Sequence, residues 1–317
     1  MSLKWLPVLL ATCTAEVPAW TNFLVFDDHY LPMAKCWLRW FEKTLSPKPL
    51  QVGCMDSLSC EEAERWRTRL QGQIGGMNVT DVVKSYSMFL RPAAGAQISS
   101  QGEAKIIHPH AHKPRQMIRS EHDADAGFPR SNYIQIYHQM VWDALSQKKS
   151  VLHLDVDAVW LRNPDANLSK VLQQYPDADI IASSSTEWDP KKIAEKWGFV
   201  LNVGFIMYRY TERVQQLFRE DLLSIPREEQ SCQVLLNFAL DRKGCQWSGS
   251  DQENRVGICG DIKIVALPQA FVSRATDLVY DPDDPAMPII AHPDTGLLHL
   301  TGINRMEKFH DMNLCTE

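Results

Sequence analysis

The segment Val151-Leu-His-Leu-Asp-Val-Asp-Ala-Val-Trp-Leu-Arg-Asn-Pro164 constrains the fold and the chemistry of this chain more than any other. Its first half is an apolar, β-prone run that predicts a buried strand, and Asn163-Pro164 is typical of the break after a strand. Asp155 and Asp157 are two residues apart, so both carboxylates at a strand end can reach one hard cation. The segment predicts a metal site for a phosphate-bearing substrate.

The context of this aspartate pair distinguishes it from others in the chain. The same Asp-x-Asp spacing occurs at residues 123/125, 177/179 and 281/283. Only the pair at 155/157 follows a full apolar strand and precedes Trp160-Leu161-Arg162. An aspartate-rich turn without a metal is the alternative for this segment taken alone.

The composition is that of an ordinary globular protein. The 317 residues are 44% hydrophobic and 23% charged, which allows a large core in one α/β domain or in two intimate lobes. The formal charge of -6 argues against a nucleic-acid partner, because such a partner needs a basic surface. No apolar stretch reaches the roughly 20 residues that span a bilayer, so no membrane span is expected. Residues 4–11 resemble a weak signal peptide, but we interpret them as the start of the first strand.

The cysteines and the sequons bear on the compartment. The eight cysteines include no Cys-x-x-Cys pair, which argues against zinc, while their even number leaves disulfides open. Asn78-Val-Thr80 and Asn167-Leu-Ser169 match the N-glycosylation sequon, which matters only in a secretory compartment. The chain as written is interpreted as cytoplasmic, with the Golgi lumen as the alternative if an N-terminal anchor was removed.

Short apolar runs alternate with helical patterns, which predicts a mostly parallel sheet covered by helices. Besides the strand that ends at Asp155, strands are expected at 6–12, at 23–26 or 50–55, and at 179–185, 199–210 and 297–305. Helices are expected after a capping box of Ser59 and Glu62, after the caps Ser131 and Thr211, and over 229–240.

Two further patterns concern the middle of the chain. The helix after Ser131 carries an apolar face made of Ile134, Tyr137, Val141 and Leu145. Residues 91–130 have no sustained period and predict a long loop. The histidines at 108, 110 and 112 are interpreted as solvated, because no carboxylate or cysteine joins them at ligand spacing.

Several polar residues near predicted strands and helices are candidates for the site. Gly204 interrupts an apolar strand, which indicates close approach by a ligand or another backbone. Gln233 and Asn237 are one helical turn apart and face the same way, with surface amides as the alternative. His299 is a candidate third metal ligand and Arg305 a candidate phosphate partner, although a lone histidine is also typical of a core.

Taken in order, these segments resemble the nucleotide-diphospho-sugar transferases of glycosyltransferase family 77 over roughly residues 131–308. Four motifs match: a long helix and a strand ending in DxDxxWLxxP at 131–164, a strand toward the donor sugar at 180–185, Asn-x-Gly-Phe at 202–205, and the His-x-x-Gly-x-x-[Lys/Arg] ending of related retaining transferases at 299–305. The first of these motifs is specific.

The resemblance implies a GT-A fold, in which helices flank a Rossmann-like, mostly parallel sheet, and a single catalytic domain over 1–317. Residues 1–157 would then bind the nucleotide, and residues 158–317 the donor sugar and the acceptor. The implied reaction is metal-dependent transfer, with retention, of a sugar from a UDP-sugar such as UDP-galactose or UDP-xylose. The implied acceptor is a hydroxyl on a glycan or glycoprotein.

The resemblance also implies roles for individual residues. The cation, Mn²⁺ or Mg²⁺, is expected on Asp155, Asp157 and His299. Binding of the donor nucleotide is expected from Asp155, Thr12, Ser184, Gly204, Arg305 and Lys308. Catalytic roles are expected for Gln233, Asn202, Cys232 and Glu229. In the family pattern an acidic residue stands where this chain has Cys232, so Glu228 or Glu229 substitutes, the sugar differs, or the activity is weak.

Two other classes of protein fit parts of the pattern. Residues 155–159 also match the haloacid-dehalogenase phosphatases, with Asp155 as nucleophile and Asp157 as acid/base. The later acidic motif of those enzymes is not matched well, because Asp283-Asp284 lies in a proline-rich stretch. Cys232 leaves open a catalytically silent protein that binds a nucleotide sugar.

Overall fold

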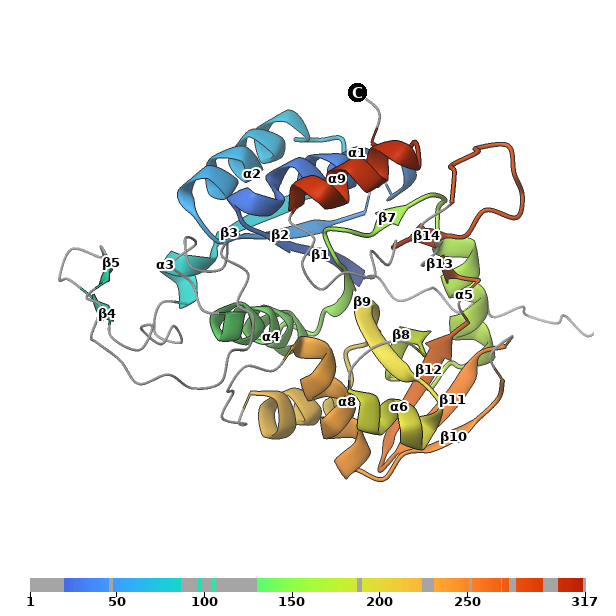
Figure 1. Cartoon of the computed structure of the whole chain (residues 1–317). Coiled ribbons are helices and arrows are strands. Elements are labelled where there is room, and N and C mark those ends of the chain that lie inside the picture. Colours follow the sequence, from blue (N-terminus) through green and yellow to red (C-terminus); the bar gives the residue numbers. More distant parts are fainter. Residues whose placement is uncertain are drawn as a thin grey trace, which may run out of the picture.

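The computed structural model describes residues 20–45, 48–86, 96–98, 104–106, 130–186, 190–223, 231–250, 253–268, 270–273, 278–292 and 302–315. A nine-stranded sheet lies at the centre (Figure 1). Its strands, in sheet order, are β10 (Gln246–Ser248), β11 (Arg255–Cys259), β12 (Ile262–Leu267), β8 (Ile180–Ser185), β9 (Val200–Tyr208), β6 (Ser150–Leu154), β1 (Trp20–Phe26), β2 (Leu50–Cys54) and β3 (Met77–Asp81). Only β9 and β11 run against the rest, which confirms the α/β class with a mostly parallel sheet.

Helices cover both faces of this sheet, and each face has its own apolar cluster. The helices on one face are α1 (Leu31–Leu45), α2 (Ser57–Arg69) and α5 (Asp165–Gln174). Those on the other are α4 (Arg130–Ser146), α7 (Glu212–Gln216), the π-helical turn Leu217–Leu222, and α8 (Cys232–Arg242). The short helices are α3 (Val82–Tyr86) and α6 (Lys191–Trp197). Each helix buries an apolar stripe, so the sheet is shielded from water on both sides.

Among the described helices, none combines the length and the hydropathy needed to cross a membrane.

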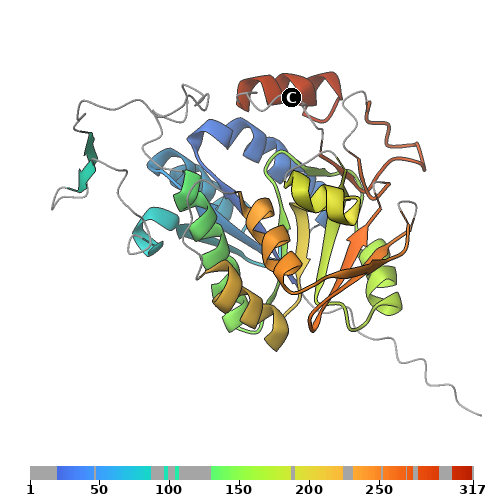
Figure 2. The same ribbon diagram turned by 60° about the horizontal axis from the view of Figure 1, so that its bottom comes forward.

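A third apolar cluster holds the C-terminal part of the chain against α1. Helix α9 (Gly302–Asp311) lies along α1 in both views (Figures 1 and 2). The cluster contains Trp40 of α1, Val159, Phe309 and Met312. A disulfide between Cys36 and Cys315 fixes the same contact, and two more join Cys54 to Cys60 and Cys245 to Cys259. The Cys36–Cys315 bond closes a loop of almost the whole chain, so it removes much entropy from the unfolded state.

Two small sheets complete the fold. One consists of β7 (Val159–Trp160), β14 (Ile290–Ala291) and β13 (Val272–Ser273). The other is the antiparallel pair β4 (Ala96–Ile98) and β5 (Ala104–Ile106), so two described parts of the expected 91–130 loop are short strands, and its last residue begins α4. The remainder of that loop, its histidines and the expected strand at 6–12 lie outside the described residues.

Most expected elements are present. The alternatives at 23–26 and 50–55 are both strands, β1 and β2, and the runs at 179–185 and 199–210 form β8 and β9. Thr211 caps α7 through a hydrogen bond that its Oγ1 accepts from the Val214 amide at 3.3 Å. The expected face of α4 is buried.

Three expected boundaries are wrong. The capping box consists of Asp56 and Ser59, because Asp56 Oδ1 accepts the Ser59 amide, while Glu62 instead accepts the indole N–H of Trp66. Helix α4 begins at Arg130, so Ser131 lies inside it. Residues 302–305 belong to α9 rather than to a strand, because apolar residues recur at helical spacing further along the segment, at Met306, Phe309 and Met312, and pack in the cluster with α1.

The Asp-x-Asp pair at 177/179 is structural. Asp179 is fully buried at the start of β8, where Arg213 binds both of its oxygens at 2.9 Å. The Thr211 hydroxyl and the Lys263 amide donate to the same carboxylate at 2.8 and 2.9 Å. These four hydrogen bonds join β8, α7 and β12, so this carboxylate serves the fold.

We predict that Asp179→Ala lowers the free energy of unfolding by about 3 kcal/mol, because it leaves buried donors without their acceptor. Asp177→Ala is the matched control: Asp177 is exposed and pairs only at the surface with Lys263, so its loss should cost less than about 1 kcal/mol. Urea unfolding followed by circular dichroism measures both. Equal midpoints for the two variants would contradict the structural role of Asp179.

Candidate metal and donor site

The turn after β6 places two carboxylates at the carboxyl edge of the sheet. All five residues of β6 are buried between β1 and β9. The Asp155 amide donates to the Gly204 carbonyl at 3.0 Å, which extends the β6–β9 ladder by one residue. The Ala158 amide then donates to the Asp155 carbonyl at 3.0 Å and closes a turn that contains Asp157. The buried strand and the turn therefore fix the backbone positions of both aspartates.

A histidine from the far end of the chain meets this turn through strand pairing. Strand β14 runs antiparallel to β7, with Ala291 opposite Val159. The next residue, His292, therefore stands opposite Ala158 and beside Asp157. Its amide donates to the Ser273 carbonyl at 2.8 Å, which fixes its backbone to the neighbouring strand β13.

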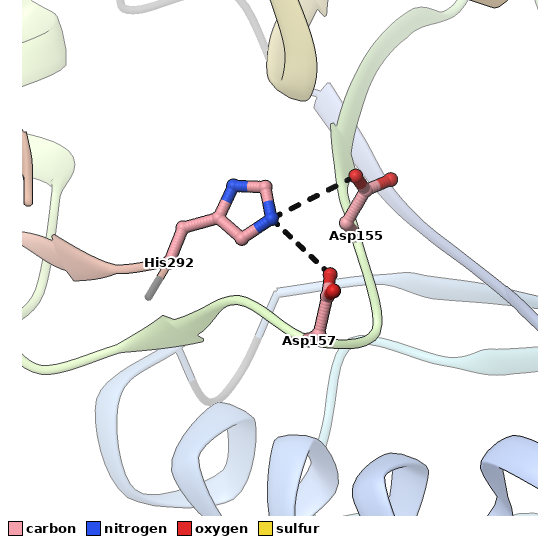
Figure 3. Close-up of side chains that lie close together, drawn as sticks. All are labelled: Asp155, Asp157 and His292. Atoms are coloured by element: carbon pink, nitrogen blue, oxygen red, sulfur yellow. Dashed lines mark ion pairs between the residues drawn. The ribbon is translucent and has the colours of Figure 1, made fainter. Parts of the chain in front are cut away.

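The three side chains form a cluster with the geometry of a cation site (Figure 3). His292 Nε2 lies 3.2 Å from Asp157 Oδ1 and 4.0 Å from Asp155 Oδ2, and the three ligand atoms lie within 4.8 Å of one another. In an octahedral shell with bonds of about 2.1 Å, neighbouring ligand atoms are about 3 Å apart and opposite ones about 4.2 Å. One imidazole and two carboxylates suit Mn²⁺, and the carboxylates also suit Mg²⁺.

The sequence patterns predicted the two aspartates but not His292. The third ligand was expected at His299, which lies outside the described residues. The signal for His292 was present in the sequence: the short apolar run 287–291 ends at this histidine, as the run of β6 ends at Asp155. Its pairing partner was not visible, because β7 and β14 have only two residues each.

Gly204 provides the space that the imidazole of His292 occupies. The pairing of β8 with β9 shifts register between Ala182 and Ser183, and Gly204 lies in the resulting bulge. A Cβ atom on Gly204 would lie 2.2 Å from His292 Cε1 and 2.6 Å from His292 Nδ1. Close approach at this glycine was expected from a ligand or another backbone, but the neighbour in the structure is the side chain of the candidate ligand His292.

A chain of buried amides supports this bulge. Asn202 Oδ1 accepts the Gly204 amide at 2.8 Å, and Asn202 Nδ2 donates to Gln233 Oε1 at 2.8 Å. Asn237 Oδ1 accepts the Leu201 amide, and its Nδ2 donates to the Leu201 and Gln233 carbonyls. All three side chains are buried, so the surface alternative for Gln233 and Asn237 is wrong. Asn237 joins α8 to β9. The pair Asn202–Gln233 joins α8 to the bulge at Gly204, which contacts His292.

Ser184 and Cys232, which were also expected in the site, are not part of the Asp155–Asp157–His292 cluster. The Ser184 hydroxyl donates to the Leu267 carbonyl at 2.9 Å and so links β8 to β12. Cys232 is a buried thiol within the apolar cluster that contains Tyr137 and Tyr208. Burial raises the pKa of both phenols, so they stay neutral.

The remaining expected residues are only partly visible or not visible at all. Arg305 and Lys308 lie on α9, and their side chains are outside the described part of the structure. Thr12 and Glu229 fall outside it altogether.

A cavity opens at the same edge of the sheet, beyond the ends of β1, β2 and β3. Its volume is about 1020 Å³. Its lining includes Asp27 and Asp28 after β1, Asp56 after β2, Asp81 at the end of β3, and Lys84. Since β1 lies beside β6 and runs parallel to it, this cavity and the Asp155 turn share one edge. Parallel sheets bind ligands at this edge, and the volume suits a nucleotide.

We predict that Gly204→Ala weakens Mn²⁺ binding by at least about tenfold, because the new methyl group must displace the His292 ring. Gly53→Ala in β2 is the matched control, since its Cβ would meet the flexible end of Met140 at 2.8 Å and Val82 Cγ2 at 3.2 Å, and neither belongs to the candidate site. Isothermal titration with Mn²⁺ reports the affinity of each. Wild-type affinity in Gly204→Ala would show that His292 does not serve the cation.

A second prediction separates the two C-terminal histidines. His292→Ala should reduce Mn²⁺ affinity by about tenfold or more, because the cluster loses one of its three ligand atoms. His299→Ala should leave the affinity near that of the wild type. Titration of both variants decides the assignment, and the reverse result would return the ligand role to His299.

None of the curated proteins matches this sequence directly. Among solved structures, the chain is similar to the glycosyltransferase GlyE of Streptococcus pneumoniae, with 13% identity and a TM-score of 0.47, over 93% of this chain and 60% of that one. This chain thus spans about three fifths of the GlyE chain.

Two further solved structures are similar to this chain at low sequence identity. One is mouse xyloside xylosyltransferase 1, with 8% identity and a TM-score of 0.46, over 88% of this chain and 98% of that one. The other is the galactosyltransferase LgtC, solved with donor and acceptor sugar analogues, with 12% identity and a TM-score of 0.38, over 94% and 98%.

The family assignment comes from the sequence itself. The sequence profile for nucleotide-diphospho-sugar transferases matches residues 108–312, about two thirds of the chain. The match includes both aspartates and His292. The chain belongs to the nucleotide-diphospho-sugar transferase family.

Proposed function

We propose that this protein transfers a sugar, with retention and with the help of a divalent cation, from a UDP-sugar to a hydroxyl on a glycan or glycoprotein. UDP-galactose and UDP-xylose are the donors to test first. The observation that carries the proposal is the cluster Asp155–Asp157–His292 at the carboxyl edge of the sheet, in a chain of this family. Family membership also argues against the phosphatase alternative.

The cluster would serve the leaving diphosphate. A cation held there supplies positive charge against the negative charge that develops on the departing phosphate. Asp155 and Asp157 would bind the cation through carboxylate oxygens, and His292, which follows β14, would add an imidazole nitrogen. Arg305 and Lys308 on α9 remain our proposed cationic partners for the diphosphate.

The cavity beyond β1, β2 and β3 would hold the nucleoside part of the donor. Asp27 and Asp28 present carboxylates there, which can accept hydrogen bonds from ribose hydroxyls or from a base. The cavity and the cluster lie along the same carboxyl edge of the sheet, and the diphosphate of the donor would extend from one toward the other. This division agrees with a nucleotide-binding half at 1–157 and a half for donor sugar and acceptor at 158–317.

The buried amides would orient the sugar. Asn202 fixes Gln233 through the 2.8 Å hydrogen bond between their side chains, and both lie next to the bulge beside His292. Cys232, where the family pattern has an acid, is packed in the apolar cluster, and we assign it no direct contact with substrate. In retaining transfer the leaving phosphate can take the acceptor proton on the same face, so a protein carboxylate is not required as nucleophile.

The disulfides favour the secretory alternative for the compartment. Three disulfides within the described residues are typical of proteins that fold in an oxidising environment. The Golgi lumen therefore agrees better with the structure than the cytoplasm does. Glycan and glycoprotein acceptors are present in that compartment.

The test is a thermal-shift series with UDP-, GDP- and CDP-sugars, each with and without Mn²⁺. The correct donor at 100 times its Kd adds about 2.7 kcal/mol of apparent stability, which raises the melting temperature only when the cation is present. Asp157→Asn should lose this shift, whereas Asp283→Asn, in the exposed Asp-x-Asp pair, should keep it.

Slow release of UDP from the stabilising donor then distinguishes an enzyme from a catalytically silent binder. Stabilisation that does not depend on Mn²⁺, or that survives in Asp157→Asn, would contradict a metal-dependent site at this turn. No stabilisation by any of the nucleotide sugars would contradict the proposed donor class.

A further inference from the structure

His153 lies two residues before Asp155 on β6, so both side chains are on the same face of the sheet. The imidazole is buried, with 3% exposure, in the middle of the central strand. Its Nε2 atom lies 2.9 Å from Asp155 Oδ1. This contact joins a buried side chain of the sheet to one of the candidate metal ligands.

The contact divides the two oxygens of Asp155 between different neighbours. Oδ1 accepts from His153, while Oδ2 is the oxygen that faces His292 Nε2 at 4.0 Å. The Asp155 side chain is one third exposed, so without a partner its carboxylate could rotate or turn toward water. A hydrogen bond to Oδ1 leaves Oδ2 directed at the position of the cation.

The ring of His153 is itself held in place. Tyr137 of α4 packs on it edge to face, with ring centroids 4.7 Å apart. The other ring nitrogen, Nδ1, is buried and has no hydrogen-bond partner among the described residues. The Nε2 contact with Asp155 is therefore the polar interaction by which this imidazole acts on the cluster.

We propose that His153 is a positioning residue, which orients Asp155 for the cation without touching the cation itself. With Nε2 as the donor, the partner is a carboxylate oxygen 2.9 Å away, and hydrogen bonds to carboxylates are stronger than neutral ones. Hydrogen bonds to metal ligands from surrounding residues typically change metal affinity by about tenfold to a hundredfold. This inference rests on the proposed metal site and adds a residue that the sequence motif does not include.

Two amide variants test the geometry of the donor. The amide nitrogen of glutamine in His153→Gln can reach the position of Nε2, whereas that of asparagine in His153→Asn reaches only the position of Nδ1. Both variants place the same polar group in the same buried site, so they control for each other. His138→Phe controls for loss of a buried imidazole, because His138 lies on α4 and packs against Tyr137 and Phe218 instead of Asp155.

The measurement is a Mn²⁺ titration followed by electron paramagnetic resonance, with and without saturating UDP, since bound Mn²⁺ loses the six-line signal of the free ion. We expect His153→Asn to bind Mn²⁺ at least about tenfold more weakly than wild type, and His153→Gln to recover most of that loss. His138→Phe should retain wild-type affinity. Circular dichroism melts establish that each variant is folded.

The outcomes separate this inference from the proposed function. Equal Mn²⁺ affinity for wild type, His153→Asn and His153→Gln would overturn the positioning role while the metal site stands. Equal losses in both amide variants would also overturn it, because the position of the donor would then be irrelevant. Absence of Mn²⁺ binding in the wild type, with or without UDP, would overturn the proposed metal site and this inference together.

Discussion

The pairing of β7 with β14 is the contact on which the candidate site depends. It is only two residues long, yet it brings His292 to a turn more than 130 positions earlier in the chain. So short a pairing is not stable alone. It is supported by the apolar cluster that joins β7 and β14 to α1 and α9, and by the disulfide between Cys36 and Cys315. The packing of α9 on α1 and this disulfide thus stabilise the segment that carries His292.

The other side of the site depends on a close approach that only glycine permits. Gly204 leaves room for the His292 ring, and its backbone also pairs with the Asp155 amide. The bulge that presents this glycine is held by the Asn202 amide, which is in turn fixed by Gln233 on α8. The helix, the central strand and the two candidate ligands are therefore coupled through hydrogen bonds and van der Waals contact. Such coupling holds a metal site in one geometry before the cation binds.

Sequence patterns predicted the parts of the fold that are local. The apolar run before Asp155, the Thr211 cap and the buried face of α4 depend on neighbouring residues, and they are confirmed. Sequence patterns gave the wrong structure or the wrong residue where contacts between distant parts of the chain determine it. Residues 302–305 joined a helix that packs on α1, and His292 became a candidate ligand through a pairing too short to carry a signal. Whether His299, Thr12 or Glu229 contributes stays a prediction.

The candidate cation site is tested most directly by a crystal grown with Mn²⁺ and UDP and measured at the manganese absorption edge. We predict one strong anomalous peak about 2.2 Å from oxygens of Asp155 and Asp157 and from His292 Nε2, with the diphosphate completing the shell. A peak bound by other residues, or a cation coordinated by the aspartates with the His292 ring turned away, would contradict it.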